Sequence, residues 1–196
     1  MKVGITGGIG SGKSIVTKIF KSLGIPVYNA DDAAKRLMNE NQSLRNQLQE
    51  IFGNDIFPVE GLFDRKKLAS IVFQQPELLQ KLNGLVHPAV GKDYQEWQKK
   101  QNAPYTLREA AILYESGTHI DLDAVIMVDS PEDLRIERIK NRDGRTEGEI
   151  KSIMQRQWPA GDLRSRANFI IENDETHPLI PQVLAIHQQL LSHGRK

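Results

Sequence analysis

A glycine-rich segment near the N-terminus carries the clearest chemistry in the chain. Gly7–Ser14 (GGIGSGKS) matches the pattern G-x-x-x-x-G-K-[ST] and stands between an apolar run at 3–6 and a helical pattern at 15–23. The backbone N–H groups of such a loop, with the positive end of the following helix, bind phosphate. Lys13 would reach the β- and γ-phosphates of a nucleotide, and Ser14 would bind Mg²⁺. The alternative is a turn that only joins strand to helix.

The rest of the loop and the start of the helix should hold the nucleotide. The loop predicts binding of ATP or GTP. The sequence lacks an Asn-Lys-x-Asp tetrapeptide that would read guanine, which argues against a GTPase switch. The residues predicted to bind ATP are Gly8, Ile9, Gly10, Ser11, Gly12, Lys13, Ser14 and Ile15.

A carboxylate after the second apolar run is the next candidate for chemistry. The run at 25–28 predicts a strand, and the tetrapeptide NADD follows it. Because ligands of open α/β sheets bind beyond the carboxyl ends of the strands, Asp31 should face the loop and could accept a proton from an attacking hydroxyl group. Alternatively, Asp31 or Asp32 only caps the next helix, predicted over 33–38.

Three arginines share one face of a helix predicted over 134–142. Arg135, Arg138 and Arg142 are spaced i, i+3 and i+7, and a polar, glycine-containing loop follows. Runs of charge are usually solvated faces. Beside a phosphate-binding loop, however, arginines suit a lid that closes over the transferring phosphoryl group. We favour a lid over about 139–159.

The lid is predicted to contain a second helix. Gly144 lies in the loop that separates it from the arginine helix. Thr146 and Glu149 have the spacing of a capping box. The helix should run to Trp158 and stop at Pro159.

Three other polar residues have two interpretations each. His87 precedes a proline, so a buried hydrogen bond is as plausible as a substrate contact. Glu115 follows the third predicted strand and either contacts substrate or shapes the loop. Asp129 ends the fourth and either supports a metal ion or begins the next helix.

The elements that must position these residues form an α/β fold. Five apolar segments predict a parallel sheet, at 3–6, 25–28, 105–111, 124–128 and 169–171. With the loop, they predict a three-layer fold of the P-loop NTPase type, in a single domain over 1–196. Its parts should be a nucleotide-binding core (about 1–32, 103–138 and 160–196), a helical substrate-binding insertion (about 33–102) and the lid.

Composition limits the partners and the location. The chain has 196 residues, a formal net charge of +1 and 26% charged residues, so no overall field attracts nucleic acid or an anionic membrane. It contains no cysteine, which excludes disulfides and thiolate metal sites and fits a reducing compartment. No apolar run reaches ~18 residues. We expect a cytoplasmic protein with no obligate protein partner.

Further motifs accompany the loop. They are Thr-Gly-Gly-Ile-Gly-Ser-Gly-Lys-Ser at 6–14, Asn-Ala-Asp at 29–31, Leu-Val-His-Pro at 85–88, Arg138, Arg142-Asp143, Gln157 and Ile-Ile-Glu-Asn at 170–173. With this set, the sequence resembles the dephospho-CoA kinase family over nearly its whole length. The resemblance implies phosphorylation of the ribose 3′-hydroxyl group of dephospho-CoA by MgATP, the last step of coenzyme A synthesis.

The same resemblance implies residue roles. Asp31 would orient or deprotonate the hydroxyl group, Lys13 and the loop would hold ATP, and Asn173 would lie near the adenine. The insertion would bind the CoA moiety. The resulting candidates are Asp31, Lys13, Arg138 and Arg142 for catalysis, and Asp31, His87 and Glu115 for substrate binding.

The chain departs from the family's usual pattern at two positions. Asn29 stands where the family usually has an aspartate, and Ala111 stands where it commonly has a proline. The first departure leaves open whether this position takes part in metal or substrate binding. Two other function classes stay open: a kinase for a different small substrate, such as a nucleoside monophosphate or a sugar acid, and a nucleotide-dependent binding protein without catalysis.

Overall fold

The computed structural model describes residues 1–58, 62–73 and 75–193. The chain divides into two compact units. The first comprises Met1–Asn29 and Gln101–Lys196, and the second is Ala30–Lys100. In the described residues, no helix is long and apolar enough to cross a membrane.

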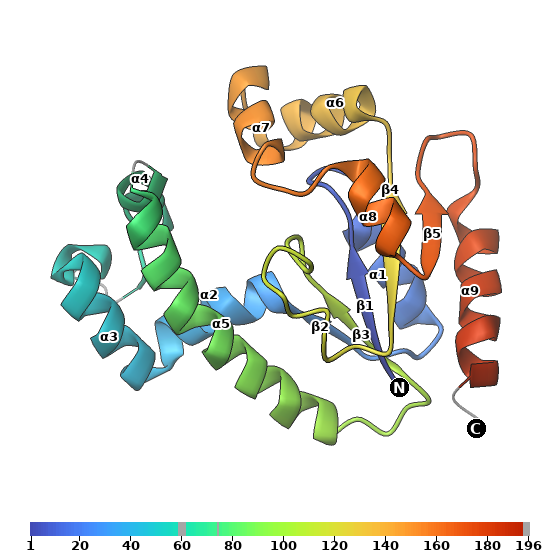
Figure 1. Ribbon diagram of the computed structural model, residues 1–196, viewed down its shortest axis with the longest axis horizontal. Coiled ribbons are helices and arrows are strands. Elements are labelled where there is room, and N and C mark those ends of the chain that lie inside the picture. The colour runs from blue at the N-terminus through green and yellow to red at the C-terminus, as the bar shows by residue number, and fades with distance from the viewer. Residues whose placement is uncertain (59–61, 74, 194–196) are drawn as a thin grey trace. The chain divides into compact units, whose positions relative to one another are not determined.

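The first unit contains a five-stranded parallel sheet (Figure 1). Its strands are β1 (Lys2–Thr6), β2 (Val27–Asn29), β3 (Thr106–Glu109), β4 (Ala124–Asp129) and β5 (Phe169–Glu172), in the order β2-β3-β1-β4-β5. The predicted α/β class and the five parallel strands are thereby confirmed. The phosphate-binding loop leaves the carboxyl end of the central strand, β1.

Two strands are shorter than the sequence predicts. β2 begins at Val27 rather than at residue 25, because Pro26 has no N–H group to contribute to a ladder. β3 ends at Glu109 rather than at Ala111, and the chain turns away directly after it. Glu109 is therefore the last residue of its strand rather than an interior one.

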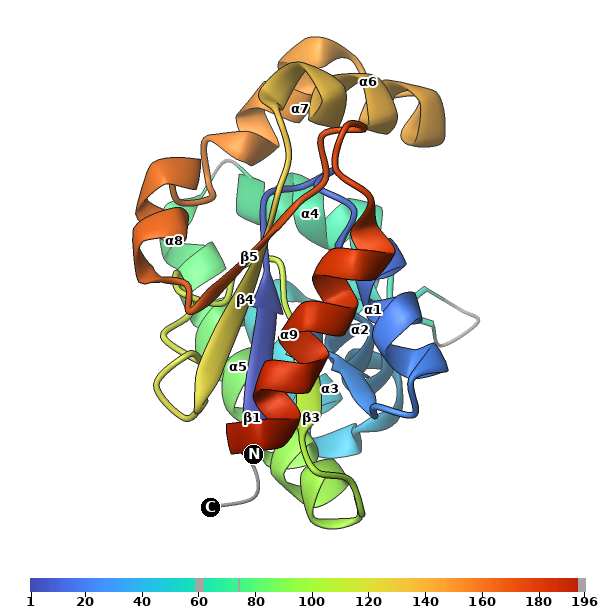
Figure 2. The same ribbon diagram turned by 90° about the vertical axis from the view of Figure 1, so that its right-hand side faces the viewer.

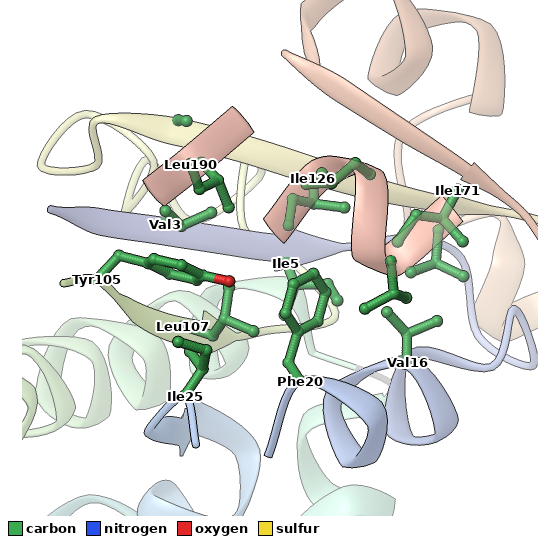
Figure 3. Packing of buried hydrophobic residues seen from close by; sticks show 14 residues of the cluster. Val3, Ile5, Val16, Phe20, Ile25, Tyr105, Leu107, Ile126, Ile171 and Leu190 are labelled. Carbon is green, nitrogen blue, oxygen red and sulfur yellow. The ribbon is translucent and has the colours of Figure 1, made fainter. Parts of the chain in front are cut away.

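The described residues of the first unit form five helices. They are α1 (Lys13–Ser22), α6 (Glu132–Asp143), α7 (Glu147–Met154), α8 (Ala160–Arg166) and α9 (Leu179–His193). Of these, α6 and α7 lie together beyond the end of the sheet (Figures 1 and 2). Side chains of α1 and α9 join the inward residues of the strands in one buried cluster, in which Figure 3 shows Phe20 beside Ile5 and Leu190 beside Val3. The α1–α9 face is thus the apolar core of this unit.

Helix α8 packs on the other face of the sheet, against β4. Side chains alternate along a strand, and Ile126 of β4 points into the cluster with α1 and α9. Its neighbour Met127 instead lines a cavity together with Leu163 of α8. Figure 2 shows β4 between α8 and α9. The two faces make the three layers of the predicted fold.

The core includes one polar pair that can be tested. A hydrogen bond of 2.6 Å joins the hydroxyl group of Tyr105 and Nδ1 of His187, and burial raises the pKa of Tyr105. We expect Tyr105→Phe to lower the free energy of unfolding by about 1–2 kcal/mol, because it leaves the imidazole nitrogen without its partner. Urea unfolding of Tyr105→Phe, His187→Leu and the double variant measures the coupling. Strictly additive losses would contradict this explanation.

The described residues of the second unit form helices and a 3₁₀ turn, as predicted for the insertion at about 33–102. Its elements are α2 (Ala30–Glu40), α3 (Gln42–Phe52), the 3₁₀ turn η1 (Asn54–Ile56), α4 (Arg65–Phe73) and α5 (Pro76–Lys99). Arg36 of α2 donates from Nη2 to both carboxylate oxygens of Asp93 on α5, each at 2.7 Å. This charge-assisted contact joins α2 to α5.

Two predicted helix limits are wrong. Helix α2 begins at Ala30 rather than at residue 33, so Asp31 and Asp32 lie in its first turn and not before it. Helix α7 ends at Met154 rather than at Trp158, although its predicted capping box is confirmed. The early end has a tertiary cause, since the N–H group of Trp158 donates to a carboxylate of another segment instead of continuing the helix.

Candidate active site

The phosphate-binding loop depends on its glycines. Gly12 has a φ of 92° and precedes α1 in the left-handed conformation that favours glycine. A Cβ atom there would lie 2.1 Å from Nδ2 of Asn173. Asn173 is buried and donates from Nδ2 to the carbonyl oxygen of Ser11 at 2.7 Å. The segment after β5 thus supports the loop directly.

Lys13 lies across the loop. Its Nζ donates to the carbonyl oxygens of Gly7 (2.7 Å) and Gly8 (3.2 Å). Ser14 and Ile15, the next two predicted ATP-binding residues, are exposed in the first turn of α1. The ammonium group is therefore held at the start of the loop, where a bound triphosphate would meet it.

Glu109 was not among the residues singled out from the sequence. It pairs with Asn29 in the register of β3 with β2, and with Ile5 in the register with β1. One carboxylate oxygen, Oε2, accepts hydrogen bonds from Nδ2 of Asn29 (3.1 Å) and from Oγ1 of Thr17 (3.4 Å). Thr17 lies one turn after Ser14 on α1, so a carboxylate stands beside the loop's helix.

The three arginines of α6 have separate contacts. Arg138 donates to Oγ of Ser130 (3.0 Å), to the carbonyl oxygen of Asn173 (3.3 Å) and to a carboxylate oxygen of Glu175 (3.1 Å). It joins β4's end to the segment after β5.

Arg142 makes a local pair instead. It donates to both carboxylate oxygens of Asp143, at 2.7 and 2.8 Å. These hydrogen bonds raise the pKa of Arg142 and lower that of Asp143. The side chain of Arg142 is 62% exposed. The arginines of the row therefore make different contacts in the structure, and their predicted roles stay predictions.

The segment after α7 is attached to the loop. Ile9 donates its N–H group to Oε1 of Gln157 (2.7 Å), and Nε2 of Gln157 donates to the carbonyl oxygen of Ala111 (2.9 Å). Glu115 accepts the N–H group of Trp158 through Oε1 at 2.7 Å. This hydrogen bond joins the segment after β3 to the segment after α7, and the two predicted roles of Glu115 stay predictions.

A cavity of about 500 Å³ lies beside the loop. Its lining includes Gly8 and Ser11 of the loop, Asp129 at the end of β4, Arg135 of α6 and Trp158. Asp129 accepts from Arg164 at 2.8 Å and from the N–H group of Ser130 at 2.9 Å. This ion pair with α8 was expected under neither interpretation of Asp129.

Comparison with known proteins identifies the family to which this chain belongs. The sequence model of the dephospho-CoA kinase family matches residues 1–178. The chain belongs to this family. A dephospho-CoA kinase of Porphyromonas gingivalis is 39% identical over 185 residues, 94% of this chain and 91% of that protein. One of Coxiella burnetii is 35% identical and covers 97% of each chain.

Solved structures agree with the family. A Thermus thermophilus protein superposes with a TM-score of 0.84 at 30% identity, over 98% of this chain and 97% of that one. The dephospho-CoA kinase of Campylobacter jejuni gives a TM-score of 0.70 at 26% identity, over 98% and 99%. Shikimate kinase of Acinetobacter baumannii, at 15% identity, a TM-score of 0.52 and coverage of 100% and 95%, shares the fold alone.

Two residues of this chain that were predicted to bind substrate lie in the second unit. Asp31 is in the first turn of α2, directly after β2, and His87 is in α5 beside Pro88. The loop, Glu109 and the arginines belong to the first unit. The roles of Asp31 and His87 stay predictions.

Proposed function

We propose that this protein transfers the γ-phosphoryl group of ATP to the ribose 3′-hydroxyl group of dephospho-CoA, which gives coenzyme A and ADP. The observation that carries the proposal is the family match over residues 1–178, which includes a complete phosphate-binding loop between β1 and α1. Such a loop alone serves many enzymes. The family match selects the acceptor and places the reaction at the last step of coenzyme A synthesis.

In the proposed reaction, the 3′-oxygen of the ribose attacks the γ-phosphorus while the bond from that phosphorus to the β-phosphate oxygen breaks, so ADP leaves. Asp31 accepts the proton of the hydroxyl group. Lys13 and the loop N–H groups hold the phosphates by charge and hydrogen bonds. Arg138 and Arg142 also serve the phosphates in this proposal, and each would exchange one of its present contacts for a phosphate oxygen.

The remaining parts have proposed tasks as well. Asn173, which already supports the loop, lies near the adenine. Residues of about 33–102 bind the CoA moiety, with His87 among the contacts, and residues of about 139–159 close as a lid. The cysteine-free sequence is consistent with a cytoplasmic location.

Mg²⁺ would bind beside the loop, where oxygen donors of the kind it prefers are present. The hydroxyl group of Ser14 and the carboxylate of Glu109 are the proposed donors, and the hydrogen bond from Thr17 keeps that carboxylate against α1. When bound there, Mg²⁺ would neutralise charge on the β- and γ-phosphates. Glu109 thereby supplies the acid that Asn29 lacks, because the two residues are direct neighbours in the sheet.

Exchanging these two side chains tests the metal proposal. We expect Glu109→Gln to weaken Mg²⁺ binding to the enzyme–ADP complex by ~10–100-fold or more, because losing even a carboxylate that only supports a metal ligand typically costs that much. Asn29→Asp combined with Glu109→Gln should recover part of the loss. Calorimetric titration of Mg²⁺ measures the affinity. Glu172→Gln, at the end of β5, is the control, and unchanged affinity in Glu109→Gln would contradict the proposal.

An acceptor panel tests the proposed function. We expect dephospho-CoA to stimulate ADP formation far more than AMP, adenosine or shikimate at equal concentrations. Stimulation by another acceptor would favour a kinase for a different small substrate. ATP binding without stimulation by any acceptor would favour a non-catalytic nucleotide-dependent protein.

A further inference from the structure

Arg135 is the most buried arginine of the α6 row. Its side chain is 13% exposed, against 28% for Arg138 and 62% for Arg142. Nη1 lies so close to the loop that a Cβ atom on Gly8 would be 2.0 Å from it. The guanidinium group therefore lies directly against the phosphate-binding loop.

The packing of α6 fixes this position. A Cβ atom on Gly10 would lie 2.7 Å from the carbonyl oxygen of Arg135 and 3.0 Å from Cδ1 of Ile139. Any larger residue at Gly10 would push the helix away from the loop. The helix backbone itself, and not only a flexible side chain, thus places Arg135 at the loop.

The charge of Arg135 is poorly compensated. Within the described part of the chain, its one ion pair joins Nη2 to Oε2 of Glu132 at 3.9 Å. Its buried Nε has no hydrogen-bond partner among the described residues. A largely buried cation is costly unless an anion pairs with it. Arg135 also lines the cavity of about 500 Å³ beside Gly8 and Ser11.

Lys13 reaches the same glycine. Its Nζ donates to the carbonyl oxygen of Gly8 at 3.2 Å, while Nη1 of Arg135 lies against the Cα of that residue. Two cations that meet at one residue of a phosphate-binding loop form an anion site of high local charge. An arginine guanidinium matches phosphate oxygens with paired N–H groups.

We propose that Arg135 is a further catalytic residue that binds the terminal phosphate of ATP and stabilises its charge during transfer. This inference rests on the proposed kinase function. Among the arginines of α6, Arg138 is held by three acceptors and Arg142 by Asp143, whereas Arg135 already faces the loop. The phosphorus changes its bond from the β-phosphate oxygen to the acceptor oxygen, and Arg135 donates to its non-bridging oxygens throughout.

Nucleotide binding tests the assignment without an acceptor. For Arg135→Met, we expect the Kd of ATP to rise roughly tenfold or more, about 1.4 kcal/mol, while the Kd of ADP stays within about twofold, since ADP lacks the phosphate that Arg135 contacts. Calorimetry with each nucleotide gives both constants. Arg135→Lys, which keeps the charge but not the paired donors, should lie between Arg135→Met and wild type.

A comparison with Glu132→Gln separates this role from a merely structural one. Glu132→Gln removes the ion-pair partner of Arg135 and should leave the ratio of the ATP and ADP constants unchanged. Equal losses of ATP and ADP affinity in the Arg135 variants, or no loss in a folded variant, would overturn the proposal. Because no acceptor is present, the result is independent of whether dephospho-CoA is the substrate. With the acceptor added, kcat of Arg135→Met should fall by ~10²–10³-fold.

Discussion

Lys13→Ala is expected to lower kcat by about three orders of magnitude or more while the fold survives, because phosphoryl transfer depends mainly on positioning and charge. The variant loses the ammonium group that now bonds the carbonyl oxygens of Gly7 and Gly8. It keeps the helix, since alanine has a high helix propensity. Steady-state ADP release with saturating ATP, Mg²⁺ and dephospho-CoA measures the loss.

A second lysine of the same helix supplies the control. Lys18 is exposed on α1, and Lys18→Ala should keep activity within roughly twofold, because a solvated surface charge contributes little. Circular dichroism and thermal unfolding establish that both variants fold. Near wild-type turnover in a folded Lys13→Ala protein would show that the loop does not hold the reacting nucleotide.

Asp31→Asn should lower kcat by ~10²–10⁴-fold, the usual contribution of a general base. An amide cannot accept the proton, although it can still orient the hydroxyl group. The loss will be smaller if the transition state is loose and the carboxylate mainly positions the acceptor. Stability should change little, since Asp31 lies in the first turn of α2, where a carboxylate contributes about 0.3–1 kcal/mol through the helix dipole.

The neighbouring aspartate makes the matched comparison. Asp32 lies in the same turn and pairs with Lys35 at 2.6 Å, with most of its side chain exposed. Asp32→Asn should therefore keep nearly full activity. Full kcat in Asp31→Asn, or an equal loss of activity in both variants, would contradict the proposal. Asp31 would then stabilise the start of α2 rather than take part in the reaction.

Local sequence signals predicted the parts of the site that depend on the backbone alone. The loop was predictable because one motif of eight residues contains both the glycines that adopt positive φ and the first residues of the helix that follows. The buried strands were predictable because parallel strands covered on both faces are nearly continuous apolar runs. The capping box of Thr146 and Glu149 is also a local pattern.

Tertiary contacts decided what the sequence could not predict. Glu109 was missed because the apolar pattern extended the third strand to Ala111, which hid an acid at the strand's true end. The i, i+3, i+7 spacing placed the arginines on one face but could not tell which would meet the loop. That choice depends on how closely α6 packs against Gly8 and Gly10.

Tertiary contacts also decide where α7 ends. Its helical pattern continued to Trp158, yet hydrogen bonds of Gln157 and Trp158 to distant segments stop the helix at Met154. Such bonds join residues more than 40 positions apart in sequence. Periodicity within one segment does not contain this information.

The position of the transferred phosphate is the most direct test of the proposed reaction. The protein is incubated with MgATP and dephospho-CoA, and the product is analysed by mass spectrometry and by ³¹P and ¹H nuclear magnetic resonance. The account predicts one added phosphate, attached to the ribose 3′-oxygen, with one ADP formed for each product molecule. An unmodified acceptor, or a phosphate attached at the 2′-oxygen or on the pantetheine arm, would contradict it.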